Sequence, residues 1–489
     1  MSEKSIGSKV LKSSFWTYLG GWSHKLIGFI STLILARILV PDDFGVVATA
    51  SIVSGLFHVI TSLGTDQYLI RKGEVDSSDL NTAWTVGLIM TLIASIGIFI
   101  SAGPVAEFMD DDRLFLVIQV LSITPFLSGF RNIGLVLYAR KYYYKPGVIL
   151  NLISRVIGLL IKVIIAMIFV NYWAFIVAEI VEILICTIGS YIIHNYRPRF
   201  SLKKIKEQWG FSQWILLKGI FVYMRYRIDT IFISKMLPAE ALGLYSVSKD
   251  VATLPAGQII SPIMAPLYVG LSSVNQQPEL FADKVHKTIS VLFLILLPIS
   301  FGTFVTADNI VTVLLGDQWV GAAPIIMVLA FNLLPGTFSD FLTKVMTAMG
   351  RVKLVFIFEV IFSLSTFLSF LLFVRGMDIV NIAMLRVGLI TINTFILIIV
   401  LSLLSSLSFF RIISIIAVPL IPTLFMVLVV MDINQYILLY SPGIQLCIQV
   451  AAGAISYLVM VSAFIFLLST RVKEYEFIWK TFYSPILNK

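Results

Sequence analysis

Long apolar stretches recur along almost the whole chain, and no other feature of the sequence constrains the fold as strongly. Each stretch has the length of about 20 residues that an α-helix needs to cross roughly 30 Å of hydrocarbon. With 58% apolar and only 13% charged residues, a chain of 489 residues is too apolar for a soluble globule. The sequence therefore predicts an all-α polytopic membrane protein with about 14 transmembrane helices. The expected spans are residues 15–38, 44–64, 80–101, 114–136, 147–170, 172–194, 211–236, 244–271, 285–306, 321–348, 352–374, 379–401, 409–430 and 445–468.

The charges between the spans fall on alternating sides. Lysine and arginine gather in segments such as 137–146 and 195–210, whereas the intervening loops carry acids such as Asp111 and Asp317. By the positive-inside rule, the basic side is the cytoplasm, and both termini lie on it. The net charge of +9 follows from basic loops against anionic lipid, so no nucleic-acid partner is expected.

A short turn motif recurs in the two halves of the chain. A cation, a proline, an acid and a glycine follow the first span, ending at Gly45, and the same types end at Gly243 about 197 residues later. An offset of six spans gives the two halves the same orientation, which predicts two six-helix lobes related as parallel repeats plus an extra helix pair. The expected divisions are an N-terminal lobe 1–194, a cytoplasmic amphipathic linker 195–210, a C-terminal lobe 211–401, an appended pair 402–468 and a cytoplasmic tail 469–489.

Cations concentrate in the seventh expected span. Lys218, Arg225 and Asp229 lie at i, i+7 and i+11, on one helical face, and one carboxylate cannot neutralise all the nearby cations. Since an intramembrane charge costs about 3 kcal/mol or more unless it is paired or hydrated, we expect a wet cationic cavity, the alternative being unconnected ion pairs. Its candidate substrate-binding residues are Lys25, Lys218, Arg225, Arg227 and Lys249. A cationic cavity favours an anionic substrate, and arginine suits phosphate oxygens.

Other intramembrane charges have different interpretations. Lys162 and Glu179 share a depth on two sides of one hairpin, which predicts a structural ion pair. Asp340 and Lys344 form an i,i+4 pair on one helix. The candidates for ion pairing or for coupling to an ion are Asp229, Asp250, Asp340 and Lys344.

No catalytic motif stands out in the sequence. It has no Walker lysine loop and no paired-histidine metal motif, and only four histidines in all. We expect no catalytic residues, no metal site and no cofactor apart from a coupling ion, H⁺ or Na⁺. ATP hydrolysis by the P-loop route is excluded.

Short motifs in fixed order give the chain a family resemblance. The chain resembles the MOP superfamily and, within it, the polysaccharide lipid-flippase branch, which is Wzx-like and includes the WzxC type of exopolysaccharide exporter. The matching residues are Leu35 to Leu39, Phe44, Gly45, Leu69 to Lys72, Phe211 to Trp214, Asp229, Gly243, Tyr245, Ala252 to Pro255, Pro262, Pro266 and Gly316 to Trp319.

The resemblance implies a flippase of the bacterial cytoplasmic (inner) membrane. Such a protein moves an undecaprenyl-diphosphate-linked oligosaccharide to the outer leaflet for exopolysaccharide or O-antigen synthesis, together with the polymerase and chain-length proteins of the pathway. No family pattern requires Arg225 and Arg227, so their roles rest on the physical argument. The alternatives are a membrane-embedded polysaccharide polymerase or ligase, which usually has a large outer loop, and a multidrug exporter, which needs an anionic cavity.

Overall fold

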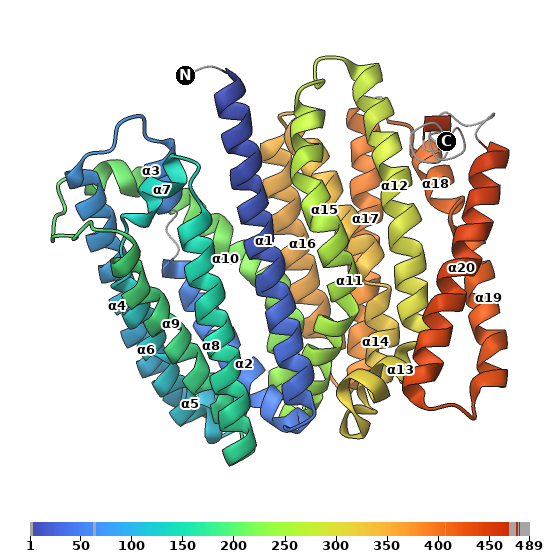
Figure 1. The fold of residues 1–489 in the computed structure, drawn as a ribbon, viewed down its shortest axis with the longest axis horizontal. Coiled ribbons are helices and arrows are strands. Elements are labelled where there is room, and N and C mark those ends of the chain that lie inside the picture. Colours follow the sequence, from blue (N-terminus) through green and yellow to red (C-terminus); the bar gives the residue numbers. More distant parts are fainter. Residues whose placement is uncertain (1–2, 62–64, 406, 469–475, 478, 480–489) are drawn as a thin grey trace. The chain divides into compact units, whose positions relative to one another are not determined.

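The described part of the chain is entirely helical. The computed structural model describes residues 3–61, 65–405, 407–468, 476, 477 and 479, and these contain helices and no strand (Figure 1). The all-α prediction is confirmed. The chain divides into two compact units, residues 1–246 and 247–489, with the division inside one long helix. The lobe, linker and tail boundaries expected from the sequence stay predictions, and the tail 469–489 lies almost wholly outside the described residues.

Unit 1 contains the first helices of the chain. Its helices are α1 (Glu3–Ala36), α2 (Pro41–Thr61), α3 (Thr65–Arg71), α4 (Ser77–Met109), α5 (Arg113–Leu121), α6 (Ile123–Gly129), α7 (Leu135–Arg140), α8 (Lys145–Phe169), α9 (Trp173–Ile193), α10 (Ile205–Met236) and the start of α11 (Ala239–Ser272).

Unit 2 contains the rest of α11 and the helices that follow it. These are α12 (Pro278–Val305), α13 (Ala307–Ile310), the π-turn η1 (Val311–Leu315), the 3₁₀ turn η2 (Asp317–Trp319), α14 (Ala322–Ala330), α15 (Leu333–Ala348), α16 (Val352–Phe373), α17 (Ile379–Leu404), α18 (Phe409–Ala417), α19 (Leu420–Ile437) and α20 (Pro442–Leu468).

Eleven helical segments of the described residues are long and apolar enough to cross a membrane. The expected spans 114–136, 211–236 and 244–271 are not among them, so the count of fourteen is not confirmed. The first consists of the short helices α5 and α6, which meet at Ser122. The other two lie within α10 and α11, whose lengths of 32 and 34 residues are sufficient to cross a membrane.

Each unit has its own apolar core. In unit 1, side chains of α2, α4, α5 and α9 bury one another, among them Val46, Ile98, Val117 and Ile176. In unit 2, α12, α15, α17 and α18 enclose a second core, and α20 is tied to α12 by a hydrogen bond of 2.7 Å from the Tyr457 hydroxyl to the Leu294 carbonyl. Helices as apolar as the surrounding lipid gain little from burial itself. Their association therefore relies on close packing of side chains.

The segment between α9 and α10 runs along α4 outside any helix. Residues 194–202 are extended, and α10 begins at Ile205. The amides of Arg199 and Ser201 donate hydrogen bonds to the side chains of Asn81 (2.7 Å) and Thr85 (3.0 Å), and the Phe200 ring meets Trp84 edge-on. These bonds satisfy an extended backbone that has no helical partner of its own.

The two glycines of the repeated turn, Gly45 and Gly243, lie where the starts of α2 and α11 approach each other closely. A Cβ atom on Gly45 would overlap the carbonyl oxygen of Ala239, and one on Gly243 would overlap that of Pro41. The equivalent positions of the two halves are 198 residues apart in both cases, Ala239 from Pro41 (239 − 41) and Gly243 from Gly45 (243 − 45). The contact is therefore reciprocal, as parallel repeats require, and only glycine allows the two backbones to approach so closely.

Candidate functional site

A polar cavity lies inside unit 1, among α1, α2, α6, α8 and α9. Its volume is about 570 Å³. Arg155 of α8 and Glu182 of α9 line it and form an ion pair with an N–O distance of 3.1 Å. The guanidinium of Arg155 also lies 3.3 Å from the imidazole of His24 in α1. Because an intramembrane charge is costly without a partner or water, this cluster marks a functional-site candidate.

Glu182 takes its position because α8 has a glycine opposite it. A Cβ atom on Gly158 would overlap the carboxylate of Glu182. The helices thus approach closely at this point, and the Glu182 side chain fills the space and meets Arg155 one turn away along α8.

The expected pair of Lys162 and Glu179 is arranged differently. Lys162 lies over the Phe175 ring, with its ammonium nitrogen 5.4 Å from the ring centroid. Its charge interacts with both Glu182 and Glu179. The direct ion pair between α8 and α9 is therefore the one between Arg155 and Glu182, and the role of Lys162 and Glu179 stays a prediction.

A second cavity of about 400 Å³ adjoins the first in unit 1. Ser128, Arg131 and Tyr144 line both cavities. The side chain of Arg131 therefore lies at the boundary of the two cavities. The sequence signal that was missed is the combination of Arg131, Arg155 and Glu182 with the glycine at 158.

The expected cationic residues are distributed over both units. Lys25 is exposed on α1, while Arg225 stacks on Tyr226, with 4.6 Å from the guanidinium carbon to the ring centroid. Arg227 interacts with Tyr223, whose hydroxyl donates a 2.7 Å hydrogen bond to the Ile52 carbonyl of α2. The side chain of Lys218 lies outside the described part, and Lys249 belongs to unit 2. Their common cavity stays a prediction.

Asp229 is a fully buried acceptor within unit 1. Its carboxylate accepts hydrogen bonds from the Tyr245 hydroxyl (2.8 Å) and the Thr230 amide (2.9 Å). The bond from Tyr245 joins α10 to the first turns of α11. The other coupling candidates lie in unit 2, with Asp250 and Asp340 exposed and Lys344 half-buried.

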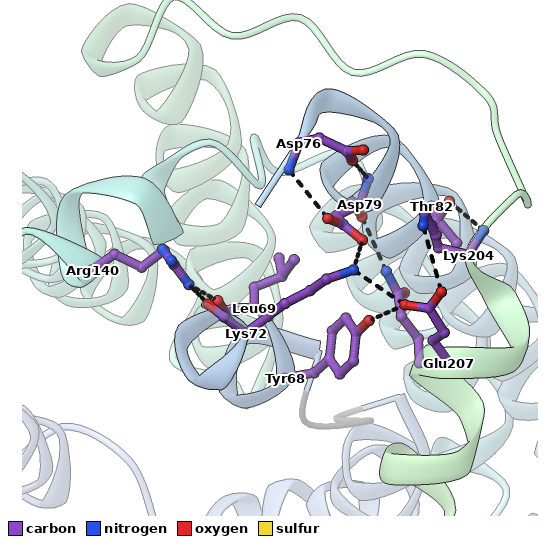
Figure 2. Close-up of polar contacts among 10 residues, drawn as sticks. Tyr68, Leu69, Lys72, Asp76, Asp79, Thr82, Arg140, Lys204 and Glu207 are labelled. Carbon is purple, nitrogen blue, oxygen red and sulfur yellow. Dashed lines mark hydrogen bonds and ion pairs between the residues drawn. The ribbon is translucent and has the colours of Figure 1, made fainter. Parts of the chain in front are cut away.

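A polar cluster joins the ends of α3, α4 and α10 (Figure 2). The ammonium of Lys72 pairs with Asp79 at 2.6 Å and with Glu207 at 3.1 Å, and the Tyr68 hydroxyl donates to Glu207 at 3.2 Å. Asp79 also forms a capping box with Asp76 at the start of α4.

The pKa values at this cluster follow from its hydrogen bonds. Donation to Asp79 raises the pKa of Lys72 above its usual value. Hydrogen bonds from Lys72 and then from Tyr68, together with the charge of Lys204, lower the pKa of Glu207. Both groups are therefore charged at neutral pH, and the cluster fastens the start of α10 to α4.

Arg140 of α7 completes the same end of unit 1. Its guanidinium donates to the backbone carbonyls of Leu69, Lys72 and Gly73 in the turn after α3 (Figure 2 shows Arg140 beside Leu69 and Lys72). A planar donor with several N–H groups can satisfy the carbonyls of one turn together. The loop before α4 is thus held by two cations, Lys72 and Arg140.

These features define a multi-pass helical membrane protein with charged and polar groups inside its first unit. A model of the polysaccharide biosynthesis protein family matches residues 34–324, more than half of the chain, so the chain belongs to this family.

Two relatives from bacteria illustrate this membership. The chain is 24% identical to the succinoglycan biosynthesis transport protein ExoT of Rhizobium meliloti (strain 1021), over 66% of each protein. It is 21% identical to the lipopolysaccharide biosynthesis protein WzxC of Escherichia coli (strain K12), over 73% of each protein. The matched part spans about two thirds of the first relative.

The fold is similar to that of the lipid II flippase MurJ in an inward closed conformation. The TM-score is 0.72 at 14% sequence identity, and the match covers 94% of this chain and 99% of MurJ. The resemblance to the polysaccharide branch is therefore confirmed by the family match, and the fold is of the same kind as that of MurJ.

Proposed function

We propose that this protein moves an undecaprenyl-diphosphate-linked oligosaccharide from the inner to the outer leaflet of the bacterial cytoplasmic membrane by alternating access. The family match over residues 34–324 carries this proposal. The names of ExoT and WzxC, and the lipid II substrate in the name of MurJ, support a lipid-linked saccharide. A diphosphate with several sugars cannot cross about 30 Å of hydrocarbon without a polar path.

We further propose that the diphosphate binds the cations predicted from the sequence, Lys25, Lys218, Arg225, Arg227 and Lys249. Arg225 suits this role because it is held by stacking on Tyr226, which orients its fork of donors. Arg225→Ala should abolish most export at normal protein levels, while Arg225→Lys should retain part of it. Equal export by both variants and the wild type would reject this cavity.

The membrane orientation and the coupling ion belong to the same proposal. Both termini lie in the cytoplasm, so a reporter fused at Lys206 should report cytoplasm and one at Asp111 the outside. A gradient of H⁺ or Na⁺, or consumption of the product outside, supplies the driving force. Polymerase and chain-length proteins of the pathway are the expected partners.

The position of the stalled substrate tests the function. A strain without this protein should retain single repeat units on the cytoplasmic leaflet, where a membrane-impermeant glycosidase added to intact spheroplasts cannot digest them. Permeabilised spheroplasts provide the control for total substrate. Units that the enzyme digests in intact spheroplasts would instead show that this protein is a polymerase or ligase.

A further inference from the structure

We infer that the fourth expected span of each half contains a hinge, built in the same way in both units, at which that half bends during transport. In unit 1 this span is formed by α5 and α6, and in unit 2 by α14 and α15. The inference rests on the proposed function, because a hinge serves a protein that alternates between two conformations.

Both spans are broken at the same point. The first piece of each has nine residues, α5 (Arg113–Leu121) in unit 1 and α14 (Ala322–Ala330) in unit 2. The break then falls at Ser122 in unit 1, and at Phe331 and Asn332 in unit 2. At 1.5 Å per residue, nine residues extend about 14 Å, so each break lies near the middle of a bilayer core of roughly 30 Å. At this depth the backbone groups of the break need partners within the protein.

A proline follows each break at the same position. Pro125 is the third residue of α6, and Pro335 is the third residue of α15. Proline has no N–H group to donate to the carbonyl four residues earlier, so a straight helix through either break would lose a backbone hydrogen bond. Proline alone does not cause the breaks, because Pro104 and Pro298 lie inside α4 and α12, which continue past them.

A serine of the preceding membrane helix binds a carbonyl at each break. In unit 1 the Ser95 hydroxyl of α4 donates to the Ser122 carbonyl, and in unit 2 the Ser300 hydroxyl of α12 donates to the Ala330 carbonyl. The two serines are 205 residues apart (300 − 95), and the two carbonyls are 208 apart (330 − 122). Each break therefore has a donor from the equivalent neighbouring helix.

A threonine of the last span of each half binds the second piece. The Thr187 hydroxyl of α9 donates to the Leu127 carbonyl of α6 at 3.1 Å, and the Thr394 hydroxyl of α17 donates to the Pro335 carbonyl of α15 at 3.0 Å. The threonines are 207 residues apart (394 − 187), and these carbonyls are 208 apart (335 − 127). Since serines, threonines and carbonyls share nearly one offset, the arrangement belongs to the internal repeat and occurs once in each unit.

Hydrogen bonds from side-chain hydroxyls suit a hinge. A hydroxyl group rotates to meet its acceptor, so it can keep donating to a carbonyl while the angle between two helix pieces changes. Bending an unbroken helix in hydrocarbon would instead leave carbonyls without donors, which is costly. The two pieces of each span can therefore tilt about the break while the serine and the threonine keep them attached to their neighbours.

Spin labels on both sides of the break in unit 1 measure its bending. Phe115 of α5 and Phe130 at the end of α6 are exposed, and 15 helical residues between them would separate their backbones by about 22 Å if the span were straight. The labels are attached to cysteines at these positions of the full-length protein, with Cys186 and Cys447 changed to alanine. We expect two distances in this protein and a single, longer one after Pro125→Ala, because alanine restores the missing N–H group. A single narrow distance before the proline is replaced would show a static kink and overturn the inference.

The same distances test the serine. Ser95→Ala removes the donor to the Ser122 carbonyl and should change the ratio of the two distances, whereas Ser95→Thr keeps a hydroxyl and should retain the ratio. Ser101→Ala is the control on the same helix, because the Ser101 hydroxyl donates to the Ile98 carbonyl of α4 itself. An unchanged ratio in Ser95→Ala would exclude this serine from the hinge.

Export by proline variants connects the bending to transport. Pro125→Ala and Pro335→Ala should each lower the amount of surface polymer in the complemented deletion strain by about tenfold, the value of one backbone hydrogen bond that favours the straight span. Their unfolding midpoints should equal or exceed that of the wild type. Pro104→Ala and Pro298→Ala are the matched controls in unbroken helices and should export normally. Equal export by all four variants would overturn the inference, and the flippase function would survive that result, since the glycosidase experiment tests it separately.

Discussion

Two of the ion pairs in unit 1 lie in contrasting surroundings. Lys72 and Asp79 lie at a helix end, where a capping box, Tyr68 and Glu207 complete their hydrogen bonds. Arg155 and Glu182 lie within two membrane helices and border a cavity, with His24 as a further neighbour of Arg155. The Asp79 side chain is 2% exposed, whereas that of Arg155 is 39% exposed.

The difference in surroundings indicates the role of each ion pair. A buried and saturated network fixes one conformation, because loss of any member leaves another polar group without a partner. A pair that borders open space can exchange one partner for a ligand. We therefore expect substitutions at the first pair to change stability, and substitutions at the second to change ligand response as well.

The largest expected effect is that of Lys72→Ala. It leaves the buried carboxylate of Asp79 without its cation, which should destabilise unit 1 by about 3 kcal/mol. The unfolding midpoint and the yield of monodisperse protein measure this loss. Lys141→Ala, at an exposed lysine of the same membrane face, should leave both unchanged. Equal stability of the two variants would contradict a structural role for the Lys72 pair.

The next effect in size is that of Gly158→Ala. The added methyl group overlaps the Glu182 carboxylate and moves it away from Arg155, at an expected cost of about 2 kcal/mol. Gly147→Ala is the control on the same helix, because its methyl group would meet nothing within 4 Å. It should be neutral or slightly stabilising. A fall in the midpoint of Gly147→Ala as large as that of Gly158→Ala would show that the helix, and not the carboxylate, is affected.

A smaller effect is expected from the coupling between Arg155 and Glu182. A double-mutant cycle of Arg155→Gln and Glu182→Gln should give an interaction energy of about 1 kcal/mol in unfolding experiments. Cycles that pair either variant with Gly147→Ala should give no interaction energy, because Gly147 touches neither side chain. An interaction energy near zero for Arg155 and Glu182 would show that their ion pair contributes nothing to stability.

The smallest effect is that of Glu207→Gln. Glu207 is exposed, and exposed ion pairs contribute little to stability. Its pKa is lowered by Lys72, so its contribution is present above the ordinary glutamate pKa and disappears as the pH falls through the lowered value. The wild type should therefore lose a small increment of stability in acid that the variant lacks. Parallel pH profiles of the two proteins would rule out this contribution.

The sequence predicted the helical class, the positions of most spans and the repeated turn, because apolar length and turn chemistry are local properties. It did not predict the ion pair between Arg155 and Glu182 at the α8–α9 contact. Equal distance from the hairpin suggested Lys162 with Glu179, but the close approach at Gly158 brings Glu182 to Arg155. Axial depth alone does not determine which side chains meet across two helices, since rotation and crossing point decide it as well.

The expected span 114–136 shows another limit of local reasoning. Its composition is mostly apolar, yet most of it folds as α5 and α6, and the Ser122 carbonyl at their junction accepts a hydrogen bond from Ser95 of α4. A hydropathy pattern cannot reveal such a break, because a tertiary partner stabilises it. The same holds for residues 194–202, whose polar partners lie on α4, more than a hundred residues earlier.

The close contact between the starts of α2 and α11, at Gly45 and Gly243, constrains how this chain can change in evolution. When two copies are related by a two-fold axis, every contact occurs twice, once in each direction. Pro41 with Gly243, and Ala239 with Gly45, meet in this way within one polypeptide. A side chain at either glycine would separate the same two helix starts. Although the two halves are free to diverge elsewhere, at this point the sequence of each half sets the space available to the other.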